Sequence, residues 1–135
     1  VPSLVSTAGL PKTILAMGCF DAGDRMVGEN LKDVADGRTE GRKNCIFAQI
    51  SESRTGRCIR TEDYLYSVYA PGLDGWNEGS SDYYRDDFLY DLRKDPFELD
   101  NLVGNPDYQE IRNSLALSLI QEMVKAGEQA PVIGF

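Results

Sequence analysis

The chain has 135 residues, 41% of them hydrophobic, which is enough for one domain that buries a core without disulfide staples. Its 22 Asp and Glu outnumber its 14 Lys and Arg, and the net charge of -8 repels phosphate backbones and anionic lipid. We therefore expect no nucleic-acid partner. We also expect no membrane span, because no stretch approaches the ~18 consecutive apolar residues of a membrane helix.

The N-terminal third is expected to be irregular. A short helix over residues 2–8 is predicted to stop at Gly9 and Pro11, since glycine tolerates the left-handed cap position and proline cannot continue a helix. Glycines then recur among many charges, which favours a loop with at most one helical turn at residues 29–35. We assign residues 1–43 to this irregular segment and residues 44–135 to an α+β subdomain.

Strands are predicted next. Residues 45–50 carry apolar side chains on both faces, which is typical of a central strand covered on two sides. Residues 57–61 and 64–70 flank a short polar gap and predict a hairpin. The segment 72–86, around Trp76, is a loop of roughly fifteen residues, a length often associated with function. Another strand is expected over residues 87–92.

The last predicted element is a long helix. Asn105 is suited to cap exposed amides and Pro106 to occupy the first helical position, while Lys125 and Gly127 mark the end. The fold class is therefore α+β: a small antiparallel sheet of about four strands packed against this helix. The apolar stripe that should face the sheet comprises Ile111, Leu115, Leu119 and Met123, widened by Leu117, Ile120 and Val124.

The residue types limit the chemistry. The chain has no histidine, which excludes Ser-His-Asp and Cys-His catalysis. Cys19, Cys45 and Cys58 form neither a CxxC pair nor a zinc pattern, and small core residues are the favoured interpretation, although Cys58 lies between two arginines. Because three is an odd number, at least one thiol stays unpaired within the chain. The cysteines therefore do not indicate a cellular compartment. Asp21, Asp24 and Glu29 lack the spacing of a calcium loop, so no metal is assigned.

The connection between the first two predicted strands, residues 49–57, is a candidate substrate-positioning loop. It has five polar residues, Gln49, Ser51, Glu52, Ser53 and Arg57. Of these, Gln49, Glu52 and Arg57 are the substrate-pocket candidates, and no catalytic residue is assigned. An ordinary polar turn is the competing interpretation, and both stay open. For the acidic and aromatic residues 82–87, a charged surface loop is favoured over a pocket.

Two stretches carry a family resemblance. "IRTEDYLYSVYAPG" and "FLYDLRKDPFELDNLVGNPDYQEIRNSLALSLIQEM" resemble the C-terminal part of sulfatases of the alkaline-phosphatase-like superfamily. The start, "VPSLVSTAGLP", is similar to the end of the helix that precedes this region, whereas "ILAMGCFDAGD" has no counterpart. The positions that match are Arg57, Ile59, Arg60, Thr61, Tyr64 and Tyr66, then Leu89, Tyr90, Asp91, Leu92, Asp95, Pro96, Glu98, Asn101 and Leu102.

The resemblance implies a fragment of a sulfuric ester hydrolase. Family catalysis uses a formylglycine made from Cys or Ser in C/S-x-P-x-R, together with a divalent cation, calcium or magnesium. None of the three cysteines is followed by that motif. The resemblance therefore implies a non-catalytic subdomain without a cofactor of its own, docked on a missing catalytic domain of the same polypeptide. Its loops would border a pocket for a sulfated small molecule or glycan, with residues 1–43 as the linker.

Two alternatives remain open. The same subdomain occurs in phosphodiesterases and phosphonate hydrolases of the superfamily, and a free-standing binding domain would have the same fold. A C/S-x-P-x-R motif upstream in the gene would favour the sulfatase, and an upstream Thr or other nucleophile the phospho-hydrolase. Without the catalytic domain, apolar groups such as Ile14, Phe20 and Trp76 are expected to be exposed, and the fragment is expected to form a homodimer.

Overall fold

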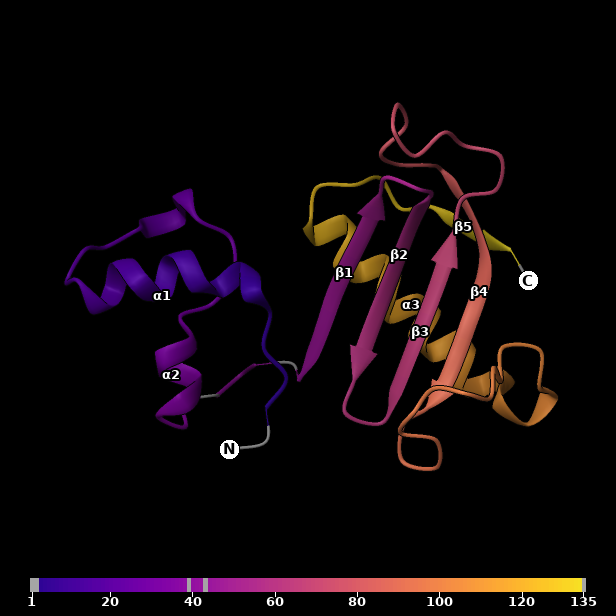
Figure 1. Cartoon of the computed structure of the whole chain (residues 1–135), viewed down its shortest axis with the longest axis horizontal. Coiled ribbons are helices and arrows are strands. Elements are labelled where there is room, and N and C mark those ends of the chain that lie inside the picture. The colour runs from indigo at the N-terminus through magenta and orange to yellow at the C-terminus, as the bar shows by residue number, and fades with distance from the viewer. Residues whose placement is uncertain (1–2, 39, 43, 135) are drawn as a thin grey trace. The chain divides into compact units, whose positions relative to one another are not determined.

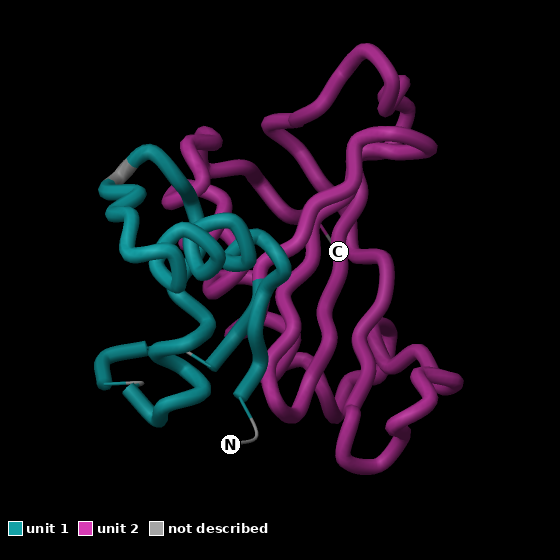
Figure 2. Tube along the Cα trace, turned by 60° about the vertical axis from the view of Figure 1, so that its left-hand side comes forward, with its two compact units in different colours: residues 1–46 teal, residues 47–135 magenta. Residues whose placement is uncertain are grey.

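A computed structural model describes residues 3–38, 40–42 and 44–134 of the chain. The chain divides into two compact units, Val1–Ile46 and Phe47–Phe135, which Figure 2 colours separately. Unit 1 is helical, and unit 2 contains a sheet and a long helix (Figure 1). Among the described residues, no helix combines the length and the apolar character needed to cross a membrane.

Unit 1 contains more helix than its sequence predicted. A 3-10 turn, Thr7–Gly9, leads into α1, Leu10–Met17, and α2 spans Leu31–Ala35. The expected helix over residues 2–8 is wrong for residues 3–6, only Thr7 and Ala8 belong to the 3-10 turn, and Pro2 lies outside the described residues. Pro11 stands in the first turn of α1, where its missing N–H costs no hydrogen bond. The Gly-x-Pro signal therefore starts a helix here instead of ending one.

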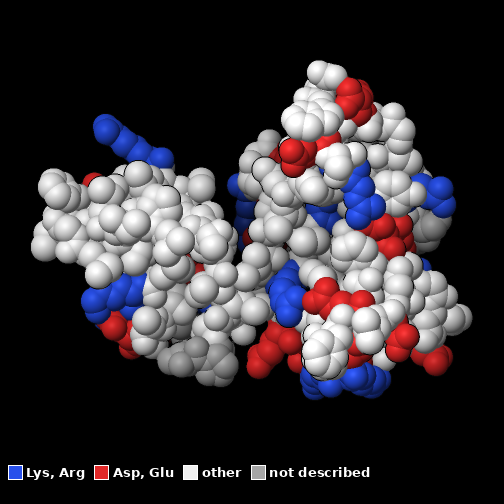
Figure 3. Space-filling model, in the orientation of Figure 1, with Lys and Arg blue, Asp and Glu red and all other residues white. Residues whose placement is uncertain are grey.

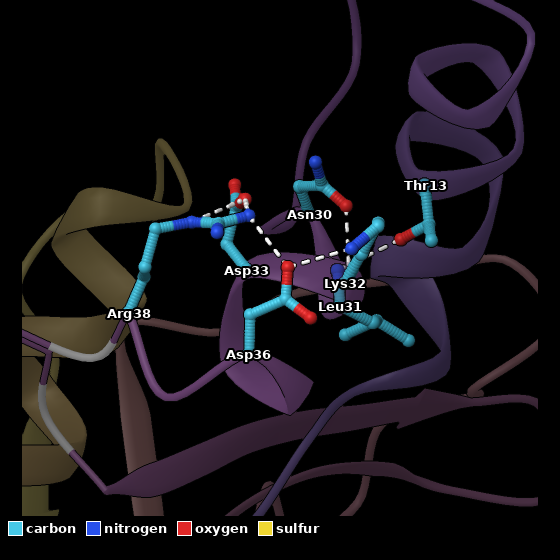
Figure 4. A network of polar contacts seen from close by, with 7 residues as sticks. All are labelled: Thr13, Asn30, Leu31, Lys32, Asp33, Asp36 and Arg38. Carbon is cyan, nitrogen blue, oxygen red and sulfur yellow. Dashed lines mark hydrogen bonds and ion pairs between the residues drawn. The ribbon is translucent and has the colours of Figure 1, made fainter.

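A network of polar contacts joins α2 to α1 (Figure 4). Thr13 Oγ1 donates to the carbonyl of Gly9 at 2.7 Å and accepts from the amide of Leu31 at 2.8 Å. Asn30 Oδ1 caps α2 by accepting from the amide of Lys32 at 3.0 Å. The other contacts are ion pairs, which link Lys32 with Asp36, and Arg38 with Asp33 and Asp36.

The sheet has five strands in the order β1-β2-β3-β4-β5. The pairs β2–β3 and β3–β4 are antiparallel, and β5 joins β4 in parallel, so the sheet is mixed. The expected α+β class, with a small sheet and a long C-terminal helix, is confirmed. The strands are β1 Cys45–Ser51, β2 Thr55–Thr61, β3 Tyr64–Tyr69, β4 Tyr83–Asp91 and β5 Val132–Gly134.

The strands differ from the prediction at three points. β1 is an edge strand, not a central one, and its residues 48–51 are exposed. Apolar groups on both faces cannot by themselves show whether a strand has one neighbour or two. β4 starts at Tyr83 instead of Asp87, because the carboxylates of Asp86 and Asp87 find cationic partners within unit 2. The short strand β5 was not predicted.

The C-terminal helix is confirmed. Asn105 Oδ1 accepts from the amide of Asp107 at 3.0 Å, a 3-10 turn spans Pro106–Tyr108, and α3 runs from Gln109 to Lys125. α3 crosses one face of the sheet (Figure 1) and contacts β2 and β3. Its buried residues are Leu115, Ala116, Leu119 and Met123, whereas Leu117 and Val124, expected to widen the stripe, are exposed.

The core lies between α3 and the sheet. Ile59, Tyr66 and Leu89 stand opposite one another on three adjacent strands, and each is at most 1% exposed. Because side chains alternate along a strand, these three share the face that α3 covers, and Cys58, Ser67 and Phe88 share the other. We call these the covered face and the open face.

The connection between β4 and the 3-10 turn at Pro106, residues 92–105, is rich in acids and is held by side-chain hydrogen bonds; we call it the acid-rich connection. Asp95 Oδ2 accepts from two backbone amides of the turn, one of them at 2.8 Å. Asn101 accepts from the amide of Leu89 at 3.0 Å and donates to the carbonyl of Asp87 at 3.0 Å. Glu98 adopts a left-handed conformation, φ 58°, and pairs with Arg60 at 2.9 Å. This ion pair therefore links the two sequence stretches that resemble sulfatases.

Candidate functional site

Three connections of unit 2 meet at one end of the sheet. They are residues 49–57 around the β1–β2 turn, the loop 72–82 and the segment 126–131 after α3, which all lie at the top of Figure 1. Thr55 Oγ1 donates to the carbonyl of Glu78, and Arg57 Nη2 donates to the carbonyl of Gly79 at 2.7 Å. We call this region, which contains all three predicted pocket residues, the upper end.

Arg57 links the three connections of the upper end. The residue is 3% exposed, and its Nε and Nη2 donate to the carboxylate of Glu128 at 2.8 and 3.1 Å. Nη1 donates to the carbonyl of Gly56 at 2.7 Å, and the guanidinium lies 5.7 Å from the centre of the Tyr84 ring. A buried Arg–carboxylate pair in this forked geometry is well suited to hold segments in place. Each of its three nitrogens thus has a partner within the chain.

Gln49 and Glu52 are exposed at the same end. Gln49 borders a mostly apolar hollow of about 180 Å³ on the sheet. Glu52 belongs to the next turn, where its carbonyl lies against Gly75 of the 72–82 loop. The structure thus brings Gln49 and Arg57 to one hollow and places Glu52 beside it. The hollow is lined by Ala48, Gln49, Ile50, Arg54, Gly56, Arg57, Cys58, Ser67 and Phe88.

Arg54 and Cys58 at this hollow are not set up for reaction, because Arg54 is paired and Cys58 is protonated. Arg54 pairs with Asp87, and its guanidinium lies 5.7 Å from the centre of the Tyr69 ring. Burial raises the pKa of the Cys58 thiol, which keeps the thiol protonated and favours the core interpretation over a nucleophile. On the face of unit 2 that Figure 3 shows, acidic and basic side chains lie among one another.

A second, polar hollow of about 390 Å³ lies between the 72–82 loop and the segment after α3. The amide of Ser81, which lines this hollow, donates to the hydroxyl of Tyr84 at 3.1 Å, and burial raises the pKa of that hydroxyl. Glu128 borders this hollow and also holds Arg57, a role that sequence reasoning missed because the two are 71 residues apart. The hollow is lined by Ser80, Ser81, Asp82, Gly127, Glu128 and Gln129.

Metal-binding residues were sought among all described residues. No group of three or more His, Cys, Asp or Glu side chains there is placed to hold an ion. Of the acids weighed for a calcium loop, Glu29 pairs with Arg42 at 2.6 Å, and Asp21 caps the amide of Gly23 at 2.8 Å. The side chain of Asp24 lies outside the description.

The chain is similar to portions of larger proteins. No protein-family model matches the chain. A 40-residue stretch is 45% identical to an ulvan-active sulfatase of Formosa agariphila, covering 30% of this chain and 8% of that protein. A protein solved in complex with its substrate, D-glucosamine-2-N,6-O-disulfate, superposes with a TM-score of 0.72 at 18% identity, covering 91% of this chain and 24% of its own.

A 2-O GAG sulfatase superposes with a TM-score of 0.68 at 22% identity, covering 88% of this chain and 24% of that chain. The chain therefore spans about a quarter of the length of these solved structures. The expected resemblance to sulfatases is confirmed, because the chain has the fold of one portion of them and shares a similar segment with a sulfatase.

Proposed function

We propose that the chain is the C-terminal subdomain of a sulfatase that hydrolyses sulfate esters, and that it is non-catalytic by itself. The observation that carries this proposal is the fold, which matches about a quarter of the length of each of these solved neighbours. The missing C/S-x-P-x-R motif and the missing histidine support it. The formylglycine and the calcium or magnesium ion belong, on this proposal, to a catalytic domain elsewhere in the polypeptide.

The upper end is the part of the subdomain that we propose to border the substrate pocket. Gln49 and Glu52 are exposed there, on a turn that packs against the 72–82 loop. Arg57, buried and bonded to Glu128, acts as a positioning residue for both connections. Residues 1–43 serve as the linker to the catalytic domain, and residues 44–135 as the docked subdomain. The substrate is a sulfated small molecule or glycan.

Kinetics of the polypeptide encoded by the complete gene test this function. We expect sulfate release from a sulfated glycan, and no release by the isolated chain in the presence of calcium or magnesium. Gln49→Ala and Glu52→Ala should raise KM by about tenfold with kcat retained, because they remove contacts shared by ground and transition states. Glu62→Ala, an exposed acid in the β2–β3 turn at the opposite end, is the matched control.

Phosphate release instead of sulfate release would favour the phosphodiesterase or phosphonate hydrolase alternative. Wild-type KM for both upper-end variants would remove these residues from the pocket border. Self-association of the fragment is a separate proposal, based on the exposed side chains of Ile14 and Phe20. Light scattering over a hundredfold concentration range tests it, and a constant mass near 15.0 kDa would contradict it.

A further inference from the structure

Trp76 is the only tryptophan of the chain, and its side chain is turned outward. The residue is 74% exposed and belongs to the 72–82 loop of the upper end. Single exposed apolar residues are common on protein surfaces and need no explanation by themselves. What distinguishes Trp76 is the way in which its loop is built.

The loop is held in one conformation from several sides. A Cβ atom at Gly75 would lie 2.7 Å from the carbonyl oxygen of Glu52, so this backbone approach requires glycine. Asp74 Oδ1 accepts from the amide of Trp76 at 3.1 Å, and the carbonyl of Asp74 accepts from the amide of Glu78 at 2.8 Å. With the bonds from Thr55 and Arg57 already described, the indole is presented on a preformed support. Preformed sites lose less conformational entropy on binding.

The loop that carries Trp76 leads to polar groups. The same loop continues into the polar hollow, where the hydroxyls of Ser80 and Ser81 and the amide of Gln129 offer hydrogen-bond donors and acceptors. The charges of the loop itself are acidic: Asp74 and Glu78 flank Trp76, and Asp82 borders the hollow. A cation beside the loop is Arg54, whose backbone lies against Gly75 and whose guanidinium pairs with Asp87. Arg57, which donates to the carbonyl of Gly79 in the same loop, pairs with Glu128. The surroundings therefore favour hydroxyl-rich ligands and disfavour anions.

We propose that Trp76 is a stacking platform for an uncharged sugar ring. The face of an aromatic ring is electron-rich, and the C–H face of a pyranose offers weakly positive hydrogens to it. The hydroxyl groups at the ring edge are then free to bond within the polar hollow. The proposal rests on the proposed function for a glycan as the ligand. It goes further, because the carboxylates of Asp74, Glu78 and Asp82 repel a sulfated ring. Trp76 therefore contacts an unsulfated sugar of the glycan, away from the reacting sulfate.

The single tryptophan makes the test direct, because all tryptophan emission comes from Trp76. The 135-residue chain is titrated with three neutral disaccharides, cellobiose, chitobiose and mannobiose, and separately with D-glucosamine-2-N,6-O-disulfate. We expect a saturable change in emission with at least one neutral disaccharide, with a Kd of about 1 mM. The disulfated sugar should bind at least fivefold more weakly.

Saturation-transfer NMR provides the control for variants that lack the fluorophore. Trp76→Ala should abolish the transfer to the neutral disaccharide, while Phe97→Ala should retain it. Phe97 is an equally exposed aromatic residue, 80% exposed, in the acid-rich connection. No saturable response to any neutral disaccharide, wild-type transfer in Trp76→Ala, or tighter binding of the disulfated sugar would each overturn the proposal. A sugar-free emission shift that depends on protein concentration would also overturn it, because a second copy would then cover Trp76.

The outcome is separable from that of the proposed function, which is measured as sulfate release by the complete polypeptide. Sulfate release without a sugar response at Trp76 overturns the platform and leaves the sulfatase proposal intact. A sugar response without sulfate release does the reverse.

Discussion

Two arginines of β2 show how the two faces of the sheet differ. Arg57 and Arg60 are three residues apart, so they point to opposite faces, and each pairs with a glutamate. On the covered face the side chains of Arg57 and Glu128 are 3% and 14% exposed, whereas on the open face those of Arg60 and Glu98 are 41% and 33% exposed. The same pairing chemistry is thus buried in one place and solvated in the other.

Removal of each arginine is the strongest test of that difference. Arg57→Met should lower the free energy of unfolding by about 3 to 5 kcal/mol, because it leaves Glu128, which is only 14% exposed, without its cation. Arg60→Met should change it by less than about 1 kcal/mol, since solvent screens the open-face pair. Urea unfolding followed by circular dichroism measures both. Equal costs for the two substitutions would show that burial does not separate the pairs.

The helix offers a second matched contrast. Leu119 is 0% exposed and Leu117 is 64% exposed, although both were predicted to belong to one apolar stripe. Leu119→Ala should cost about 2 to 5 kcal/mol through lost contacts and the cavity left behind. Leu117→Ala should stay within about 0.5 kcal/mol, as surface substitutions usually do. Thermal unfolding of both variants decides it, and a near-zero cost for Leu119 would mean that α3 packs elsewhere.

Local signals in the sequence predicted the parts of the fold that local physics determines. The start of the last helix at Asn105-Pro106 and the hairpin around Glu62-Asp63 depend on residues close together in the chain, and both are confirmed. β5 has only three residues and takes its strand conformation from pairing with β4, which no local pattern reveals. The helix α1 was missed because the same Gly-x-Pro sequence is compatible with either end of a helix.

The candidate site was predictable in the same uneven way. The polarity of residues 49–57 drew attention to the end of the sheet where the three connections meet. Burial of Arg57 was not visible, because its partner Glu128 and the carbonyl of Gly79 come from distant segments. The exposure of Trp76 was expected for another reason, the loss of a covering domain. Its support by Gly75 needs three-dimensional contacts that the sequence does not show.

The upper end can be compared with the acid-rich connection through two glycines. A Cβ at Gly75 would lie 2.7 Å from a carbonyl oxygen, whereas one at Gly104 would meet nothing within 4 Å. Gly75→Ala should therefore lower the free energy of unfolding by about 1 to 3 kcal/mol, the usual cost of overpacking. Gly104→Ala should cost little. Differential scanning calorimetry of the pair measures this, and equal Tm values would show that the 72–82 loop yields freely.

The smallest effect is expected at Glu98, where two terms of opposite sign meet. Glu98→Gly removes the strain of a left-handed side-chain residue, roughly 1 to 2 kcal/mol, but adds the chain entropy of glycine, about 0.5 to 1 kcal/mol. It also removes the open-face pair, which contributes about 0.2 to 1 kcal/mol. These terms nearly cancel, so the free energy of unfolding should change by less than about 1 kcal/mol.

Glu98→Ala is the informative partner of that variant. Alanine loses the same pair with Arg60 but keeps the left-handed strain at φ 58°, and it should therefore be less stable than the glycine variant. The difference should be about 1 kcal/mol, measurable by urea unfolding of the two proteins side by side. If alanine instead proved the more stable, the connection would be free to relax, and its left-handed turn would not be needed to carry Glu98 to Arg60. The predicted order thus tests whether the two sequence stretches that resemble sulfatases hold each other through backbone geometry as well as through charge.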